Sequence, residues 1–450
     1  MAERVDVAVV GGGLMGAAAA WAAARRGLSV ALHEQFEPEH TRGSSHGSAR
    51  IVRRGYSDAL YARLTGEAFE LWREVEIAAE VRLLRMVGGL DHGPNRTALV
   101  ANLLAEAGIP HEVVAGADAE ARWPGMHFAG PVVYHAQAGT MDADRAVTAL
   151  LDLARRAGAT IEHGSRVARV EPVRDEYAAV RLADGREFEA RCAVVAAGAW
   201  VEPLLAGQLN LPPLTVTQQQ VFHFPRRDEA AAPWPSVIHQ DAIEVYHLPG
   251  GRDGGSGDAR KVAEHTHGAA TTAEGRDDVV DAAARERILR YVSEWLPGLV
   301  PIPQGEATCL YTTSPSEDFL LDRVGPIVVC SPCSGHGAKF APLIGEMIAG
   351  LVTGDRPVPD RFRLAATKAL AAFDSIEAID GLILAAHDLD PKVRAVALDA
   401  LARISRQSRD PRATGVLLDA LEPLDGVTDH LREWTGPGPM LKPPAWAKLK

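Results

Sequence analysis

The sequence predicts an α/β protein in which a domain with a parallel sheet is interleaved with a domain that has an antiparallel sheet, followed by a helical appendage. Two observations predict the first domain. An apolar run at residues 5–10 ends in a glycine-rich turn, and a second strand–turn–helix pattern occupies residues 327–351. Short β-like segments between these two patterns, with a Gly-rich loop at 250–257, predict the second domain.

The opening motif is the fingerprint of a Rossmann-like dinucleotide site. Val5–Val10 predicts a buried parallel strand, and glycines follow it in the pattern G-x-G-x-x-G. The first glycine allows a tight turn, the second lets backbone amides approach a pyrophosphate, and the third lets the next helix pack on the sheet, with the phosphates at its N-terminus. The residues expected to contact the nucleotide here are Gly11, Gly13, Leu14, Met15 and Gly16.

The segments that follow complete this prediction. Residues 17–26 are rich in alanine and favour a helix, residues 28–33 predict a second strand, and Glu34 ends that strand. A carboxylate at this place can accept hydrogen bonds from an adenosine ribose. Further elements are expected as strands at 132–134, 167–173, 179–182, 192–198 and 327–330, and as helices at 142–157 and 339–351. An antiparallel substrate domain is expected from about residue 200 to 307.

Composition limits the classes of partner. The chain has 450 residues, of which 47% are hydrophobic, and this predicts an ordered protein of two or three domains. Its net charge of -12 argues against nucleic acid or an anionic membrane as a partner. No signal peptide or membrane-spanning segment is expected, and four cysteines make no disulfide framework, so the predicted location is the cytoplasm. Cys330-x-x-Cys333 lacks a supporting second pair of ligands, so we expect a core cysteine and a loop cysteine, and no metal.

Five motifs occur in order between about Arg4 and about Arg363: the glycine fingerprint, Arg42–Arg53, Gly198–Trp200, Thr308–Thr312 and Ser334–Phe340. Together they resemble the motifs of the monomeric sarcosine oxidases and N-methyltryptophan oxidases, which are flavoproteins similar to D-amino-acid oxidase. The resemblance implies FAD as the cofactor. It also implies an oxidase over residues 1–365, with FAD-binding parts at about 1–80, 140–205 and 308–365 and substrate-domain parts at about 81–139 and 206–307.

The resemblance assigns roles to individual residues. Cys309 matches the cysteine that is bonded covalently to the flavin. Arg53 and Lys339 match a pair that binds the substrate carboxylate, and charge-assisted bonds of this kind contribute about 1.5 to 3 kcal/mol each. Tyr311 matches an aromatic residue of the substrate pocket, and Tyr246 is a weaker candidate for the same pocket.

Four further residues are implied beside the flavin ring. His46 and Arg50 match residues close to the ring, where positive charge favours the reduced flavin. Lys261 matches by spacing a lysine that assists oxygen reduction, and His265 a nearby pocket histidine. The remaining cofactor contacts that the resemblance implies are Ser45, Val167, Gly198, Trp200, Gly335, His336 and Gly337.

The implied reaction transfers a hydride equivalent from a carbon beside an amine nitrogen to the flavin, leaving an imine, and oxygen is reduced to hydrogen peroxide. Ala338 stands where an aromatic residue is common, and Glu264 and His267 flank His265 differently from the sarcosine enzymes, so the substrate is expected to be an N-methyl or a cyclic amino acid. Three alternatives stay open. One is an FAD-dependent dehydrogenase that passes electrons to a partner, and another is a flavoprotein whose helical tail makes it mainly an interaction module. The third is an NAD-dependent dehydrogenase, which leaves the second glycine motif without a role.

The C-terminal segment is an addition that such an oxidase does not need. Asp390-Pro-Lys followed by apolar residues at helical spacing resembles one fragment of a HEAT-like repeat, within an appendage expected at 366–434. Solenoid repeats generally need about three copies to bury their faces. The segment is therefore expected to pack on the oxidase or on another protein, or to be poorly ordered, and residues 435–450 are expected to form a Pro-rich tail.

Overall fold

The computed structural model describes residues 4–174, 177–209, 211–228, 232–255, 259–265, 267–355, 358–359, 362, 379–386, 391–408 and 416–417. The chain divides into two compact units, Met1–Ala366 and Thr367–Lys450. Most of 366–434 and all of the expected tail at 435–450 lie outside the described residues. In the second unit, α10 (Ile379–Ala386) and α11 (Pro391–Ser408) share a small apolar cluster that includes Leu382 and Leu401.

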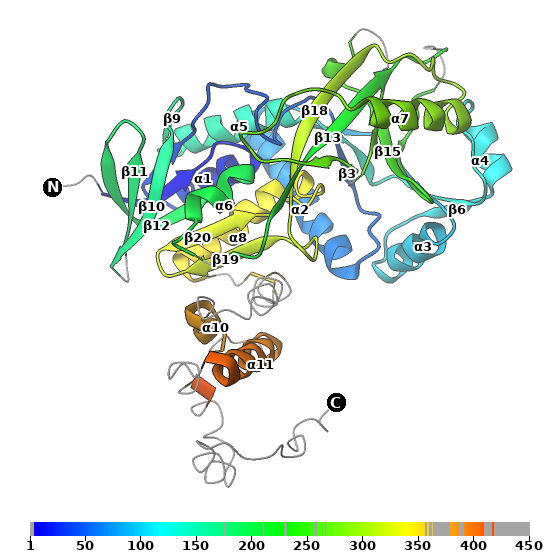
Figure 1. Cartoon of the computed structure of the whole chain (residues 1–450). Coiled ribbons are helices and arrows are strands. Elements are labelled where there is room, and N and C mark those ends of the chain that lie inside the picture. Colours follow the sequence, from blue (N-terminus) through cyan, green and yellow to red (C-terminus); the bar gives the residue numbers. More distant parts are fainter. Residues whose placement is uncertain are drawn as a thin grey trace, which may run out of the picture. The chain divides into compact units, whose positions relative to one another are not determined.

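The first unit is built around two large sheets, and the eight-stranded one confirms the predicted α/β class (Figure 1). Its centre is parallel, in the order β20-β12-β1-β2-β9, whereas β10, β11 and β19 pair antiparallel at its margins. Its strands are β1 (Arg4–Val10), β2 (Val30–His33), β9 (Thr160–Glu162), β10 (Val167–Arg174), β11 (Tyr177–Leu182), β12 (Glu187–Val195), β19 (Leu320–Val324) and β20 (Ile327–Ser331).

Small residues let helices pack closely on one face of this sheet. Every residue of α1 (Leu14–Ala24) except Met15 is buried, and α1 packs against α5 (Ala143–Arg156) and α8 (Ala341–Thr353). A Cβ atom added to Gly345 in α8 would lie 2.6 Å from the Ala18 oxygen, so this contact needs glycine. The other helices of the unit are α2 (Ala59–Ala79), α3 (Arg96–Glu106), α4 (Gly116–Arg122), α6 (Val201–Leu205) and α7 (Ala282–Trp295).

The second sheet has nine strands and is mixed, which corrects the expectation of an antiparallel sheet. All of its pairs are antiparallel except β5 with β14, which run parallel because a long excursion through the other domain separates them in the chain. Its strands are β5 (Gly89–His92), β6 (Glu112–Val114), β7 (Val132–His135), β13 (Thr215–Phe224), β14 (Ser236–Gln240), β15 (Glu244–Pro249), β16 (Arg260–Glu264), β17 (Ala269–Ala270) and β18 (Gly305–Thr313).

The chain crosses between the two sheets several times, so segments distant in sequence meet where the sheets adjoin. The eight-stranded sheet takes its strands from 4–33, 160–195 and 320–331, and the nine-stranded sheet from 89–135 and 215–313. A three-stranded sheet of β3 (Arg50–Arg53), β8 (Ala138–Met141) and β4 (Leu84–Met86) lies along these crossings. Short 3-10 turns occupy Gly198–Trp200, Arg252–Gly254 and Ala338–Phe340.

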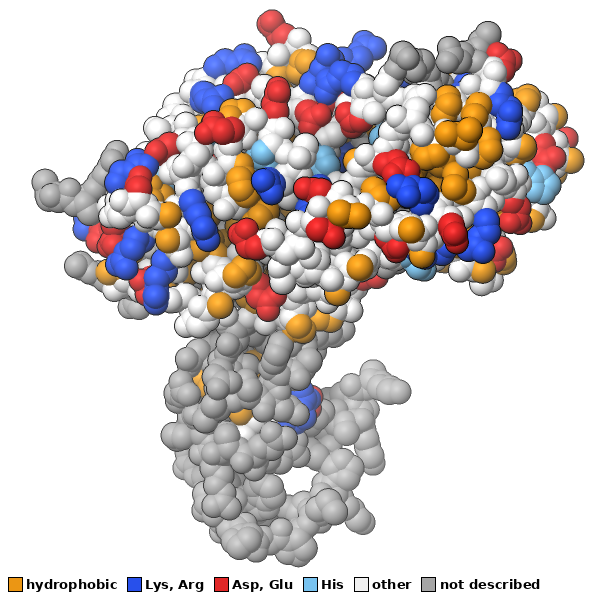
Figure 2. All heavy atoms as spheres, turned by 45° about the horizontal axis from the view of Figure 1, so that its top comes forward, with side chains coloured by type: hydrophobic (Ala, Val, Ile, Leu, Met, Phe, Trp, Pro, Cys, Tyr) orange, Lys and Arg blue, Asp and Glu red, His pale blue; other side chains and the backbone are white. Residues whose placement is uncertain are grey.

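The surface carries charges of both signs. On the face shown in Figure 2, Lys and Arg side chains are interspersed with Asp and Glu rather than gathered in one basic stripe. Within the described part of the chain, no helix combines the length and the apolar character that crossing a membrane would require.

Candidate active site

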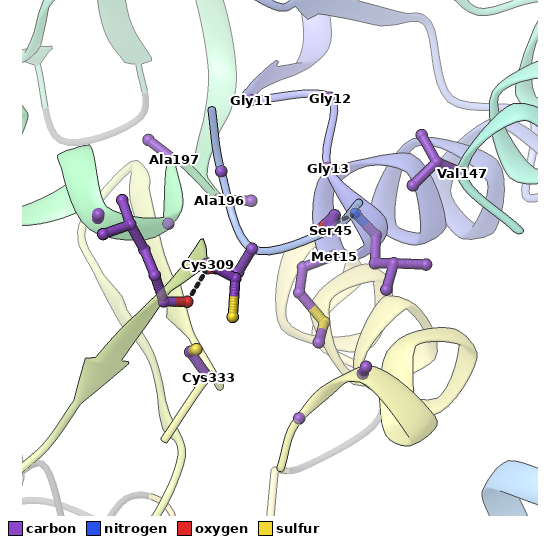
Figure 3. A pocket seen from close by; sticks show the side chains of 18 of the residues that line it. Gly11, Gly12, Gly13, Met15, Ser45, Val147, Ala196, Ala197, Cys309 and Cys333 are labelled. Atoms are coloured by element: carbon purple, nitrogen blue, oxygen red, sulfur yellow. Dashed lines mark hydrogen bonds between the residues drawn. The ribbon is translucent and has the colours of Figure 1, made fainter. Parts of the chain in front are cut away.

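One cavity of about 530 Å³ runs from the glycine turn after β1 to the second glycine motif before α8. The glycine turn, Ser45, Met15, Cys309 and Cys333 surround the same space in Figure 3. Gly16 and His46 are the two predicted site residues that are not among its described lining residues. The lining contains the others: Gly11, Gly13, Leu14, Met15, Glu34, Ser45, Arg50, Arg53, Val167, Gly198, Trp200, Tyr246, Lys261, His265, Cys309, Tyr311, Gly335, His336, Gly337 and Lys339.

The glycine turn has the backbone geometry that the fingerprint predicts. Gly11 has φ +100°, and a Cβ atom there would lie 2.6 Å from the Ala196 oxygen on the neighbouring strand connection. A Cβ atom on Gly16 would lie 1.8 Å from the Gly11 oxygen, so Gly16 contributes close packing rather than a wall of the cavity. Gly13, the N-cap residue of α1, provides no side-chain cap, so the amide-rich helix end borders the cavity.

Glu34 and Ser45 are held in place at this end of the cavity. The buried Glu34 carboxylate accepts hydrogen bonds from the Gly12 amide at 2.6 Å and the Phe36 amide at 2.9 Å. Ser45 Oγ accepts from the Leu14 amide at 3.0 Å. A dinucleotide fits this set, since a carboxylate fixed beside a glycine turn can bind a ribose and the helix N-terminus can bind phosphate.

Cys309 lies on β18, where residues two apart share a face, so Cys309 and Tyr311 both border the cavity. Ser44 Oγ donates to the Leu310 oxygen at 2.6 Å and thereby ties the segment after β2 to this strand. Arg276, which no motif indicates, reinforces the tie. Its guanidinium donates to the Thr308 oxygen at 2.8 Å and to the Arg42 oxygen at 3.1 Å.

Lys339 is a buried cation on the wall of the cavity. The structure places it in the 3-10 turn before α8, which corrects the expectation that a helix begins there. Its Nζ donates to the His336 oxygen at 2.7 Å and to the Tyr56 hydroxyl at 2.9 Å. Burial, together with the charge of Arg53, holds the pKa of Lys339 well below its usual range, so the site favours an added negative charge. Sequence patterns did not indicate Tyr56.

Arg53 has unsatisfied donors beside Lys339. Its Nε and Nη1 atoms are buried without a hydrogen-bond partner among the described residues, and its guanidinium lies 4.5 Å from the centre of the Tyr56 ring. Burial, and then the charge of Arg96, lowers the pKa of Arg53. Buried N–H groups of a guanidinium need an acceptor, and a carboxylate offers two oxygens in matching geometry. The pair of Arg53 and Lys339 can therefore bind a carboxylate.

Two tyrosines and a histidine enclose the space next to these cations. Burial raises the pKa of both Tyr246 and Tyr311, that of Tyr246 to about 12. The His265 ring lies 5.8 Å from the Tyr311 ring, and burial lowers the pKa of His265 to about 4. Both tyrosines and His265 are therefore uncharged at neutral pH.

Lys261 and Arg50 form a second cationic pair. Lys261 Nζ donates to the Ala49 oxygen at 3.0 Å, and burial, followed by repulsion from Arg50, lowers the pKa of Lys261 to about 7. Arg50 donates to the backbone oxygens of Ser44 and His46. Burial and Arg50 also lower the pKa of His46 to about 3, so the His46 ring is neutral. Lys261 is the group of this set whose charge changes near neutral pH.

The described residues hold no group of three or more His, Cys, Asp or Glu side chains that could bind a metal ion. Cys330 is buried in β20 and Cys333 follows that strand, and both border the cavity. The Cys333 Sγ accepts a hydrogen bond from the Thr312 amide at 3.4 Å. The two cysteines thus occupy a core position and a loop position.

The chain matches a family model described as FAD dependent oxidoreductase over residues 6–351. It is 34% identical to a monomeric sarcosine oxidase of Streptomyces avermitilis over 82% of this chain and all of that protein, and 30% identical to an N-methyl-L-tryptophan oxidase of Yersinia pestis over 79% and 96%. The fold is similar to that of NikD, an amino acid oxidase of nikkomycin biosynthesis, with a TM-score of 0.72, 24% identity and coverage of 80% and 97%. The chain therefore belongs to the FAD-dependent oxidoreductase family, as its resemblance to the sarcosine and N-methyltryptophan oxidases predicts.

Proposed function

We propose that this protein is an amine oxidase that acts on a secondary-amine amino acid, either an N-methyl or a cyclic one, with oxygen as the electron acceptor. The observation that carries the proposal is the pair of Arg53 and Lys339 on the wall of a cavity that a dinucleotide-type glycine turn also lines; Lys339 is buried and the Arg53 side chain is 13% exposed. Such a cavity brings an amino acid's carboxylate and a bound FAD into one enclosed space.

The residues that would hold FAD divide along the cavity. The α1 N-terminus and Glu34 would bind the pyrophosphate and ribose, and the Gly335–Lys339 segment would border the flavin. Cys309 would attach the flavin covalently, since its thiol is enclosed on the cavity wall of β18. FAD, when bound, would accept the hydride equivalent from the substrate and deliver electrons to oxygen, which yields hydrogen peroxide.

The protein's own part in the reaction is positioning and electrostatics. Arg53 and Lys339 would bind the substrate carboxylate and so orient the carbon next to the amine nitrogen. Tyr246, Tyr311 and His265 would enclose the amine group as neutral walls, which favours a substrate amine that has lost its proton. Lys261, with Arg50 and His46 beside it, would stabilise negative charge that develops as oxygen is reduced.

The test of this function begins with the purified protein. Its flavin should remain with the precipitate after acid treatment, and a Cys309→Ser variant should release it into the supernatant. Oxidation of an N-methyl or cyclic amino acid by the enzyme should then produce hydrogen peroxide and the imine-derived product in equal amounts. Substrate oxidation that proceeds only with an artificial electron acceptor, and without peroxide, would instead establish the dehydrogenase. A protein purified without any flavin would contradict the proposal as a whole.

We further propose that the C-terminal unit is a HEAT-like helical element that binds a protein partner or another part of the chain, and that the enzyme acts in the cytoplasm. The shared apolar cluster of α10 and α11 supports the first proposal. The four cysteines, none of which forms a disulfide, support a reducing compartment.

A further inference from the structure

A buried carboxylate, Asp91 on β5, lies between two arginines and is only 1% exposed. Arg96, the first residue of α3, donates from Nε to Asp91 Oδ1 at 2.7 Å, and its Nη2 lies 2.7 Å from the same oxygen. Arg53 Nη1 lies 3.8 Å from that oxygen, beyond hydrogen-bond distance. Of the two arginines, Arg96 therefore makes the close pair with Asp91.

The surroundings hold this arrangement in place. Arg96 Nη1 also donates to Gln240 Oε1 at 3.3 Å, so Arg96 is anchored on two strands. A Cβ atom on Gly55 would lie 2.7 Å from Asp91 Oδ2 and 2.9 Å from His135 Nε2, so Asp91 is enclosed on its other side. Burial lowers the pKa of His135 to about 4, which leaves that ring neutral and Arg96 as the hydrogen-bonded charge partner of Asp91.

The pairing of Arg96 with Asp91 affects the hydrogen-bond donors of Arg53. Two cations, Arg53 and Arg96, lie beside one buried carboxylate, Asp91, and Glu244 on the cavity wall adds a further negative charge that acts on Arg53. Because Asp91 is hydrogen-bonded to Arg96, the Nε and Nη1 groups of Arg53 have no hydrogen-bond acceptor among the described residues. A short movement of either side chain would close the gap of 3.8 Å and remove the free donors.

We propose that Arg96 is a positioning residue that keeps Arg53 available for the substrate carboxylate by occupying Asp91. This inference rests on the proposed function, in which Arg53 binds that carboxylate. In a protein without Arg96, the buried Asp91 would pair with Arg53, since an unpaired buried charge is costly. A substrate would then have to displace Asp91 before it could bind.

The test uses the flavin-loaded enzyme and acetate as a carboxylate probe, with binding followed by the change in flavin absorbance. Arg96→Met should raise the Kd of acetate and the KM of the substrate roughly 10- to 100-fold, the loss of one charge-assisted interaction, while kcat changes by less than about threefold. The Asp91→Asn/Arg96→Met double variant should bind acetate within about threefold of the unsubstituted enzyme, because the competing charge is gone. Arg96→Lys should give a smaller increase in Kd than Arg96→Met.

The outcomes separate this inference from the proposed function. Arg53→Met is the reference, and an unchanged acetate Kd in that variant would contradict carboxylate binding by Arg53 itself. If Arg53→Met weakens acetate binding but Arg96→Met and Arg96→Lys do not, or if the double variant binds no better than Arg96→Met, Arg96 has no positioning role. If Arg96→Met does not fold, the acetate Kd of Arg96→Lys is compared with that of the double variant instead, and the same criteria apply.

Discussion

At the scale of single residues, Lys261 offers a test in its titration. Burial and Arg50 lower its pKa to about 7, so the ammonium form is present below that pH and is lost as the pH rises through it. If the charge assists oxygen reduction, the rate constant for reoxidation by oxygen should fall across this range. Lys261→Met should lower that rate constant about 100-fold or more and remove the pH dependence near 7, as measured by stopped-flow absorbance. A variant that keeps the pH profile of the unsubstituted enzyme would exclude Lys261 as the titrating group.

Lys339 gives a second prediction at the same scale. Its buried ammonium donates to two neutral acceptors, the Tyr56 hydroxyl and the His336 oxygen, and the positive charge of Arg53 adds to the attraction for an anion. Lys339→Met should therefore raise the KM of an amino acid substrate about tenfold or more. Arg73→Met, which removes an exposed cation paired with Glu70 on α2, is the control and should leave KM unchanged. Equal effects in the two variants would argue against a carboxylate site at Lys339.

At the scale of elements, the turn after β20 depends on Gly335. This residue has φ +72°, and a Cβ atom there would lie 2.5 Å from Tyr311 Cε2 and 2.7 Å from His265 Cε1. Gly335→Ala should lower the free energy of unfolding by about 1 to 3 kcal/mol and raise the substrate KM, because backbone strain and displacement of the pocket residues act together. Unfolding in urea and steady-state kinetics measure the two effects.

Gly354, at the end of α8, is the matched control for this substitution. It has φ +78° but no atoms within 4 Å of an added Cβ, so Gly354→Ala carries the backbone strain without the contact. It should lower stability by about 1 kcal/mol and leave KM unchanged. A similar KM change in both variants would show that the effect comes from general destabilisation and not from Tyr311 and His265.

At the scale of the whole molecule, the division at residue 366 predicts an oxidase that works without the C-terminal unit. All described residues that line the cavity lie between Val10 and Lys339, and the first unit has its own apolar clusters. A chain that ends at Ala366 should keep its flavin-to-protein ratio and its turnover within about twofold. Loss of a partner or of self-association on size-exclusion chromatography would then assign that interaction to the removed unit, whereas loss of flavin would make the unit part of the oxidase.

Local backbone geometry explains how much of the site could be predicted from the sequence. Gly11 and Gly335 need positive φ angles, and Gly16 needs the absence of a Cβ atom, so these requirements appear directly as glycines at fixed spacing. His46 shows the limit of a motif. It lies in a matched segment, yet its side chain is only partly buried beside Arg50 and is not among the described residues that line the cavity.

The sequence by itself determined the α/β class, the dinucleotide turn, the family and many of the polar residues around the cavity, because motifs of a few residues encode turns and strand ends locally. Only the tertiary structure decided which charges face one another. Asp91, Arg96 and Tyr56 belong to no motif, and Arg276 reaches a loop more than 200 positions earlier in the chain. The formation of such pairs depends on how the two sheets pack against each other. That packing involves segments far apart in sequence, so no local sequence pattern predicts the pairs.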